Sequence, residues 1–293
     1  MSEFSYLATP RVTREVLEAH GLATKKALGQ NFLVNDSIIG KICGLSEVCD
    51  QDTVLEIGPG IGTLTVALLP RAAHVMSIER DKDLPPVLAQ TCGEFDNFTL
   101  VNKDALELTE EDFGDLVPTK LIANLPYAVA ATLVLDFFQR FESIQSMTVM
   151  VQREVADRMM ASMGTKDYGA YTVKLNLIAQ PAGRFIVGAN NFFPPPRVES
   201  AVIRLNRVQD AADKETIQAA SVAADAAFAS RRKTISNSMK TYFAGRIADL
   251  DPTMEIAEVL EQAGIDARRR GETLTLDEFK ALGLVLKSAG YLG

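Results

Sequence analysis

The chain has 293 residues, enough for one large domain and a smaller one, and 47% are hydrophobic, so a substantial core can form. Three cysteines without a Cys-x-x-Cys pair and two distant histidines, His20 and His74, argue against a disulfide framework and a metal site. The N-terminus lacks a charged segment followed by an apolar one, and no apolar run is long enough to span a membrane. We therefore expect a cytoplasmic protein without a metal or a membrane anchor.

The net charge of −8 is unevenly distributed along the chain. Residues 104–115 hold six acids and no base, whereas residues 222–246 hold five bases and one acid. Net charge says little when charges are segregated in this way. A nucleic acid therefore remains open as a partner.

Residues 1–24 are typical of an amphipathic helical segment. Residues 25–33, Lys-Lys-Ala-Leu-Gly-Gln-Asn-Phe-Leu, interrupt the helical spacing with a glycine and two amides. The next helix is expected to begin at Asp36 or Ser37, either of which can cap it.

Five apolar runs with helical patterns between them follow, and they cover residues 53–57, 74–79, 98–101, 121–123 and 147–151. Strands that alternate with helices predict an α/β fold, a doubly wound, Rossmann-like sheet with right-handed crossovers. Ligands of such sheets bind beyond the carboxyl ends of the strands. Four conspicuous features follow strands at these ends: the glycine-rich turn Gly58–Gly62, Glu79, Asp104 and Asn124.

The spacing of the glycines is one residue shorter than in the dinucleotide-binding fingerprint. An acid at the end of the second strand, Glu79, suits a ribose diol, and Asp104 can accept a hydrogen bond from an adenine amino group. The set favours S-adenosylmethionine over a dinucleotide. Ordinary solvated acids at strand ends are the alternative interpretation of Glu79 and Asp104.

The fourth strand runs into Asn124-Leu125-Pro126-Tyr127. Asn and Pro are common in turns, so an ordinary strand-to-loop turn is one interpretation. The other is a binding site for a flat nitrogen base, in which the amide and a neighbouring carbonyl accept hydrogen bonds while the ring stacks.

Polar residues 206–213 mark a boundary in the rest of the chain. Before them, residues 171–178, 184–187 and 198–205 are expected to be strands, and Phe192-Phe193-Pro194-Pro195-Pro196 a stiff, extended loop. After them, the pattern is helical at residues 217–228, 234–243, 254–263 and 276–289. We expect a domain of residues 1–205 and a small all-α domain of residues 206–293.

Taken in order, these motifs resemble the ribosomal RNA adenine dimethyltransferase family. The resemblance rests on blocks at residues 28–33, 56–60, 79–81, 104–105, 124–127, 152–156, 168–170 and 192–200. One branch of the family acts on small-subunit RNA and another on large-subunit RNA. Residues 227–238, Ala-Phe-Ala-Ser-Arg-Arg-Lys-Thr-Ile-Ser-Asn-Ser, are similar to the C-terminal signature of the small-subunit branch.

The resemblance implies a class I methyltransferase that uses S-adenosylmethionine to dimethylate two adjacent adenines. The target lies in a hairpin loop near the 3′ end of small-subunit ribosomal RNA, within an immature subunit, and the modification accompanies ribosome maturation. The enzyme is expected to be a monomer with an S-adenosylmethionine-binding first domain and an RNA-binding second domain. The cofactor is expected to contact Asn31, Leu33, Gly58, Glu79, Asp104 and Asn124.

The resemblance also implies which residues bind the target adenine and which bind the rest of the RNA. Asn124 and Leu125 are expected to accept from the N6 amine, Pro126 to stiffen the turn, and Tyr127 to stack on the base. Phe192, or alternatively Phe193, would close the other face, with burial in the core as the competing interpretation of both rings. RNA phosphates are assigned to a stripe on a C-terminal helix, Arg231, Arg232, Lys233 and Lys240, although a run of charge is usually a solvated surface.

Two further functions compete with the methyltransferase. A methyltransferase fold can act without chemistry, as a ribosome-assembly or transcription factor. A dinucleotide-dependent oxidoreductase is disfavoured by the glycine spacing and by the lack of a catalytic His, a Tyr-Lys pair or a metal set.

Overall fold

The computed structural model describes residues 2–23, 30–246, 250 and 252–292, and the chain forms two compact units. The first unit comprises Met1–Ala156 and Pro181–Arg207, and the second comprises Asp157–Gln180 and Val208–Gly293. Residues 157–180 therefore belong to the second unit, although we expected them in the first domain, residues 1–205. The reason is that helix α7 (Ala170–Asn176) packs against helix α8 (Lys214–Phe228) of the second unit.

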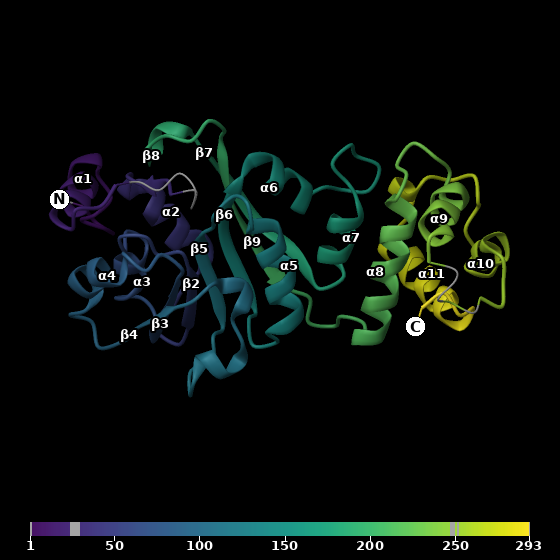
Figure 1. Ribbon diagram of the computed structural model, residues 1–293, viewed down its shortest axis with the longest axis horizontal. Coiled ribbons are helices and arrows are strands. Elements are labelled where there is room, and N and C mark those ends of the chain that lie inside the picture. The colour runs from purple at the N-terminus through teal and green to yellow at the C-terminus, as the bar shows by residue number, and fades with distance from the viewer. Residues whose placement is uncertain (1, 24–29, 247–249, 251, 293) are drawn as a thin grey trace. The chain divides into compact units, whose positions relative to one another are not determined.

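The first unit is built on a seven-stranded sheet of order β4-β3-β2-β5-β6-β9-β7 (Figure 1). Its strands are β2 (Thr53–Ile57), β3 (His74–Glu79), β4 (Phe98–Asn102), β5 (Lys120–Asn124), β6 (Ser146–Gln152), β7 (Ala179–Val187) and β9 (Ser200–Arg207). Strands β2 to β6 pair in parallel, and β9 pairs antiparallel with β6. The expected doubly wound α/β sheet is confirmed. Its order reverses between β2 and β5, the place where ligands bind in such folds.

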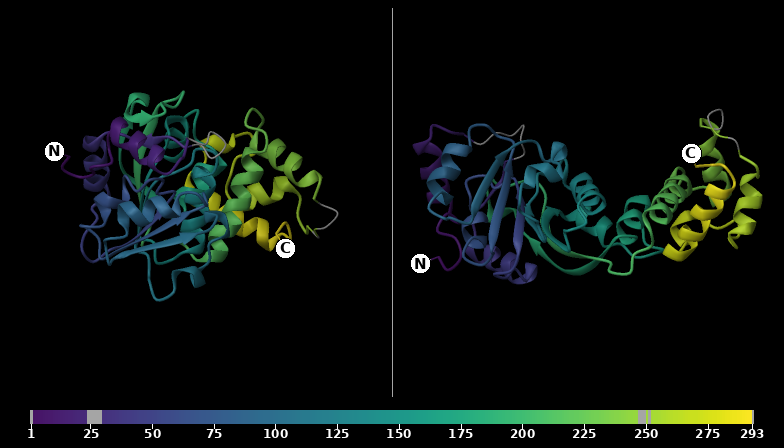
Figure 2. Two further views of the ribbon diagram at one scale, coloured as in Figure 1. Left: turned by 60° about the vertical axis from the view of Figure 1, so that its left-hand side comes forward. Right: turned by 90° about the horizontal axis from the view of Figure 1, so that it is seen from below.

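Helices cover the sheet of this unit (Figure 2). They are α1 (Pro10–Ala19), α2 (Asp36–Ser46), α3 (Thr65–Leu68), α4 (Pro85–Cys92) and α5 (Ala130–Arg140), and α6 (Arg153–Met159) follows β6. The side chains of α2, α3 and α4 share one core with β2, β3 and β6. Helix α2 is capped by Asn35, whose Oδ1 accepts from the amide of Ser37 at 3.0 Å, so its cap lies one residue before the expected Asp36.

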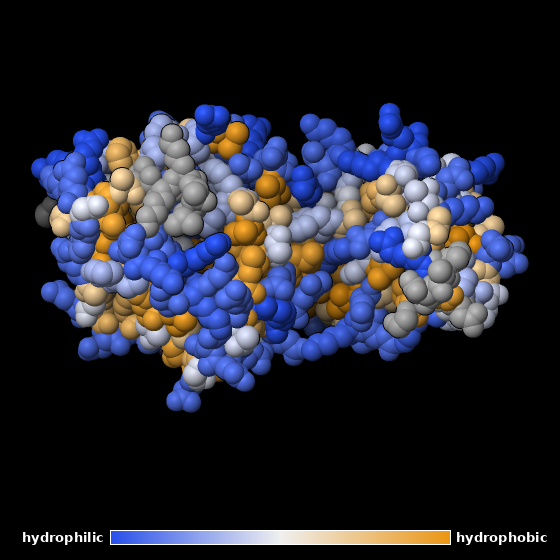
Figure 3. Space-filling view, viewed as in Figure 1, coloured by the Kyte–Doolittle hydropathy of each residue, from blue (hydrophilic) through white to orange (hydrophobic). Residues whose placement is uncertain are grey.

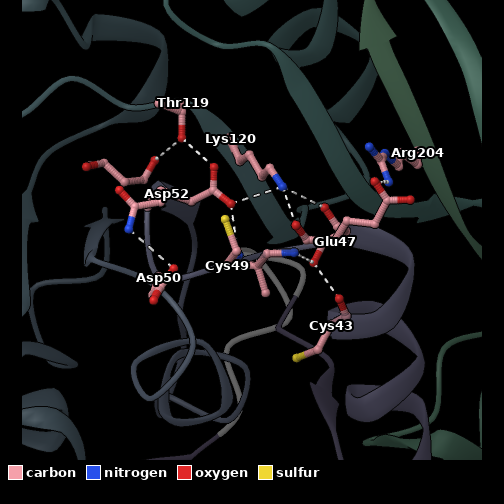
Figure 4. A network of polar contacts seen from close by, with 12 residues as sticks. Cys43, Glu47, Cys49, Asp50, Asp52, Thr119, Lys120 and Arg204 are labelled. Atoms are coloured by element: carbon pink, nitrogen blue, oxygen red, sulfur yellow. Dashed lines mark hydrogen bonds and ion pairs between the residues drawn. The ribbon is translucent and has the colours of Figure 1, made fainter.

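A network of charged side chains joins elements at the amino ends of the parallel strands, away from their carboxyl ends (Figure 4). The Nζ atom of Lys120, at the start of β5, lies 3.0 Å from Oδ2 of Asp52 and donates to the carbonyls of Ser46 and Glu47. The Glu47 carboxylate pairs in turn with Arg204 of β9 at 2.6 Å. These contacts join the turn after α2 to β5, to β9 and to Asp52 just before β2, which supports the alignment of β2 and β5 at the other end.

The second unit is mainly helical, and only the first two residues of β7, Ala179 and Gln180, are strand residues among its described part. Besides α7 and α8 it contains α9 (Ile235–Ala244), α10 (Ile256–Gln262) and α11 (Leu276–Ser288). Small residues let its helices approach closely: six alanines of α8 are buried, and a β-carbon on Gly283 of α11 would lie only 2.5 Å from the α8 backbone. The strand expected at residues 171–178 was wrong, because Thr172, Val173 and Leu175 are buried on helix α7 beside α8.

No helix in the described part of the chain is long and apolar enough to cross a membrane.

Candidate active site

A cavity of about 400 Å³ opens at the carboxyl ends of the parallel strands, a size typical of small-ligand sites. Its walls come from five segments of the first unit, residues 30–33, 56–60, 78–80, 103–105 and 124–129, with Thr63, Leu64, Leu84 and Leu133 behind them. The structure thus brings together the predicted residues Asn31, Leu33, Gly58, Glu79, Asp104, Asn124, Leu125, Pro126 and Tyr127. Residues Lys25 and Lys26, which precede the first segment, lie outside the described residues.

The glycine-rich turn requires its glycines for conformation and for space. Gly58 and Gly60 have φ angles of 69° and 62°, in the left-handed region that side chains disfavour. A β-carbon on Gly60 would lie 3.1 Å from the ring of Phe32, and one on Gly58 would point toward Pro126. The bare backbone at Gly58 therefore lets a ligand approach the space beside Pro126.

Glu79, at the end of β3, presents a carboxylate whose geometry the backbone fixes. Its Oε1 accepts from the amide of Asp81 at 2.8 Å and its Oε2 from that of Gly60 at 3.3 Å, while the residue is only 7% exposed. Burial raises the pKa of this carboxyl. Each oxygen keeps acceptor capacity toward the cavity, which suits the two hydroxyls of a ribose.

Glu56, on β2, is the most deeply buried acid of the cavity wall, at 1% exposure. Its Oε2 accepts from both Thr65 Oγ1 at 2.7 Å and Ser77 Oγ at 2.8 Å. Burial raises its pKa to about 7 against the effect of these two hydrogen bonds. Both bonds end on Oε2, so Oε1 is the oxygen that a cationic ligand group would use.

Asp104 follows β4 and is held from two sides. Its Oδ1 accepts from the amide of Leu106 at 3.1 Å, which caps a short 3₁₀ turn (Ala105–Glu107). Its Oδ2 lies 3.1 Å from Nη1 of Arg80, the residue after Glu79. The carboxylate is thereby fixed at the cavity wall. Sequence reasoning did not single out Arg80, for which the only signal is its position after the strand-end acid.

The amide of Asn124 has a defined orientation. Its Nδ2 donates to the backbone carbonyl of Asn31 at 3.3 Å, and only the NH₂ end of the amide can make this bond. Its Oδ1 is therefore the free acceptor end at the cavity. The Leu125 amide donates to the carbonyl of Met150 on β6 at 3.1 Å, and the Leu125 side chain is buried, so this backbone is anchored to the sheet.

Tyr127 is fixed at the tip of its ring. Its hydroxyl shares a 2.6 Å hydrogen bond with Oγ of Ser200, which is fully buried on β9, and burial raises the pKa of the phenol. The ring lines the cavity while its polar end is held by the sheet. Sequence reasoning placed Ser200 in a family motif but missed this contact, since nothing in the sequence joins it to Tyr127.

Neither Phe192 nor Phe193 lies where a ring that closes the second face of the base was expected. Phe192 is 4% exposed and belongs to the core, because its strand β8 (Phe192–Phe193) pairs antiparallel with β1 (Phe32–Leu33). It therefore does not line the cavity. Phe193 is partly exposed, and the guanidinium of Arg14 lies 5.3 Å from its ring centroid.

The basic residues of the second unit do not form a stripe on one helix. Arg231, Arg232 and Lys233 lie in the turn between α8 and α9, and only Lys240 lies on α9. The surface of this turn is hydrophilic in the space-filling view (Figure 3). Arg231 pairs with Glu272 at 3.3 Å and donates to the Tyr168 carbonyl at 3.1 Å, so it also has a structural role. Arg232, Lys233 and Lys240 are exposed.

Among the described residues, no three His, Cys, Asp or Glu side chains are grouped in a way that could hold a metal ion.

Comparison with known proteins gives consistent relatives. The family model described as "Ribosomal RNA adenine dimethylase" matches residues 21–282. A ribosomal RNA small subunit methyltransferase A of Enterococcus faecalis is 39% identical, with 98% of each chain covered, and one of Staphylococcus aureus strain Newman is 39% identical, with 94% of each covered.

Two solved structures share the fold at lower identity. A dimethyladenosine transferase of Plasmodium falciparum matches with a TM-score of 0.74 and 23% identity, covering 88% of this chain and 98% of its own. A 23S ribosomal RNA methyltransferase matches with a TM-score of 0.66 and 23% identity, covering 88% of this chain and all of its own.

Proposed function

The chain belongs to the ribosomal RNA adenine dimethylase family, and we propose that it dimethylates two adjacent adenines of small-subunit ribosomal RNA with S-adenosylmethionine. The choice of the small subunit rests on relatives named for it, at 38–39% identity over nearly the whole chain. The proposed target is a hairpin loop near the 3′ end of that RNA.

The cavity fits S-adenosylmethionine in volume and in the order of its polar groups. Glu79 would bind the ribose hydroxyls, Asp104 the adenine amino group, and Gly58 would let the methionine portion lie against the backbone. The buried carboxylate of Glu56 would face the ammonium group of the cofactor. Burial raises the pKa of Glu56, and the ammonium would supply the positive charge that stabilises its ionised form. Asn31 and Leu33 would cover the cofactor from the other side. The bound cofactor supplies an electrophilic methyl group on a sulfonium, a good leaving group.

The observation that carries the proposal is the fixed amide of Asn124, which lines this cavity together with Tyr127. An exocyclic adenine amine is a poor nucleophile because its lone pair is delocalised into the ring. Two acceptors, Asn124 Oδ1 and the Leu125 carbonyl, would bind its two hydrogens and favour a pyramidal nitrogen whose lone pair is available. The rate enhancement then comes from orientation and from acceptors placed before the reaction, without a covalent enzyme intermediate.

The base itself is expected to leave its stack and lie on Tyr127, whose ring is already held by Ser200. Phe192 could cover the second face only by leaving the core, and the partly exposed Phe193 does not line the cavity either, so closure of that face by either ring would need a rearrangement. After the first transfer only one N–H remains. The pocket must then hold a methyl group beside one of the two acceptors.

RNA binding is assigned to exposed cations of the second unit: Arg232, Lys233 and Lys240, with Arg231 contributing to both the fold and the phosphate contact. The net charge of −8 makes such a local basic turn necessary for a polyanionic substrate. We further propose that the protein acts as a cytoplasmic monomer on an immature small subunit, with the RNA-binding role in the second unit.

The proposal is tested by tritium transfer from labelled S-adenosylmethionine to immature small subunits from cells that lack the enzyme. Large subunits from the same cells serve as the matched control. Label in small-subunit RNA alone supports the proposal. Label in the large subunit would favour the other branch of the family, and binding to small subunits without label would favour an assembly factor without chemistry.

A further inference from the structure

Arg80 forms part of the cavity wall although its side chain is largely in water. Its guanidinium lies 3.1 Å from Oδ2 of Asp104, and both residues line the cavity. The side chain of Arg80 is 68% exposed and that of Asp104 is 27% exposed. An ion pair with this exposure contributes little to folding, so stability does not explain why the arginine lies there.

We propose that Arg80 is a further cofactor-binding residue, which covers the adenine ring on its solvent side and holds the Asp104 carboxylate toward the amino group of that ring. This inference rests on the proposed function. It adds a residue to the cofactor site and depends on neither the RNA nor the target base.

The Asp104 carboxylate has room for both partners. Its Oδ1 already accepts from the Leu106 amide and its Oδ2 pairs with Arg80, yet each oxygen has two lone pairs. An adenine amino group can therefore donate to Asp104 without displacing the arginine.

The shape of the guanidinium suits the remaining surface of the ring. It is planar and weakly hydrated, and it stacks on flat π systems better than an ammonium does. An adenine that donates to Asp104 would lie beside Arg80, so the arginine loses water on one face only when the cofactor binds. The contact then provides affinity that the free protein, with its hydrated ion pair, does not use.

The test measures the affinity of S-adenosylhomocysteine by calorimetry, without RNA or turnover. We expect Arg80→Ala to weaken binding about tenfold, the effect of one partly desolvated cation–π contact. Arg80→Lys, which keeps the charge but loses the plane, should give an intermediate affinity. Lys82→Ala is the matched control, since Lys82 is an exposed cation two residues further on that does not line the cavity, and its affinity should stay within about twofold.

The outcomes separate the inference from the function on which it rests. Unchanged affinity in Arg80→Ala would overturn the inference. Tighter binding in that variant would also overturn it, because Arg80 would then compete with the adenine for Asp104. If the wild-type protein failed to bind S-adenosylhomocysteine, the proposed function would fail first. Thermal unfolding should be nearly unchanged in every variant, given the exposure of the side chains replaced.

Discussion

Replacement of Asn124 by alanine tests the proposed chemistry at a single side chain. The variant loses Oδ1, one of two acceptors for the adenine amine, and the 3.3 Å bond from Nδ2 to the Asn31 carbonyl. Loss of one hydrogen-bonding group positioned for the transition state costs about 2.7–4 kcal/mol, or roughly 10²–10³ in kcat. The bond to Asn31 is worth about 1 kcal/mol, so cofactor affinity should fall by no more than about fivefold to tenfold.

The assay pairs single-turnover methyl transfer to immature small subunits with calorimetric titration of S-adenosylmethionine. Asn97→Ala is the matched control: its amide donates to the carbonyls of Leu69 and Ala72 at 2.9 and 3.1 Å, and it precedes β4, away from the cavity. This control should lower thermal stability and leave the rate of the folded enzyme unchanged. A rate in Asn124→Ala within about threefold of the wild type would refute the reasoning.

Three further predictions concern other parts of the site. Ser200→Ala frees the ring of Tyr127 and should raise KM for the RNA, whereas the affinity for S-adenosylhomocysteine should be unchanged. Tyr127→Phe should have the same effect, and the double variant should be no worse than either single variant. Additive losses in the double variant would contradict the link between Ser200 and Tyr127. Burial raises the pKa of Glu56 to about 7, so its carboxyl group is protonated below that pH, and cofactor affinity should increase with pH up to about 7 and then level off. Affinity that does not change with pH in calorimetry would contradict this, and so would the same pH dependence in Glu56→Gln. Loss of both Arg232 and Lys233 should reduce the slope of log affinity for RNA against log salt by about two, and an unchanged slope would show that neither contacts phosphate.

The parallel part of the sheet was predictable because its strands are apolar runs separated by helical patterns, which are visible in the local sequence. The segment 171–178 was not, because its β-branched and apolar residues fit either state. Packing of Thr172, Val173 and Leu175 beside the alanine-rich face of α8 decides for a helix, and no local pattern contains that contact. The boundary of the second unit was misplaced for the same reason.

The candidate site was predictable as far as strand ends specify it. Gly58, Glu79, Asp104 and Asn124 follow parallel strands, so the fold alone brings them to one cavity. The contacts that orient them are long-range and leave no local signal: Arg80 on Asp104, the Asn31 carbonyl on Asn124, and Ser200 on Tyr127.

Phe192 was misplaced because its burial depends on a strand pairing with residues far earlier in the chain. Arg231–Lys233 were placed on a helix by their closeness to helical patterns on both sides. The structure instead puts them in the turn that joins α8 to α9, so they do not share the face of one helix.

The central claim is that this cavity, with Asn124 and Tyr127 in its wall, is where adenine of small-subunit RNA is dimethylated. The most direct measurement is mass spectrometry of nucleosides from small-subunit RNA after reaction with S-adenosylmethionine and the purified protein. The account predicts N6,N6-dimethyladenosine at two adjacent positions of one hairpin loop, and a yield lower by roughly 10²–10³ with Asn124→Ala at the same early reaction time. A product limited to N6-monomethyladenosine, or dimethyladenosine found only in large-subunit RNA, would contradict it.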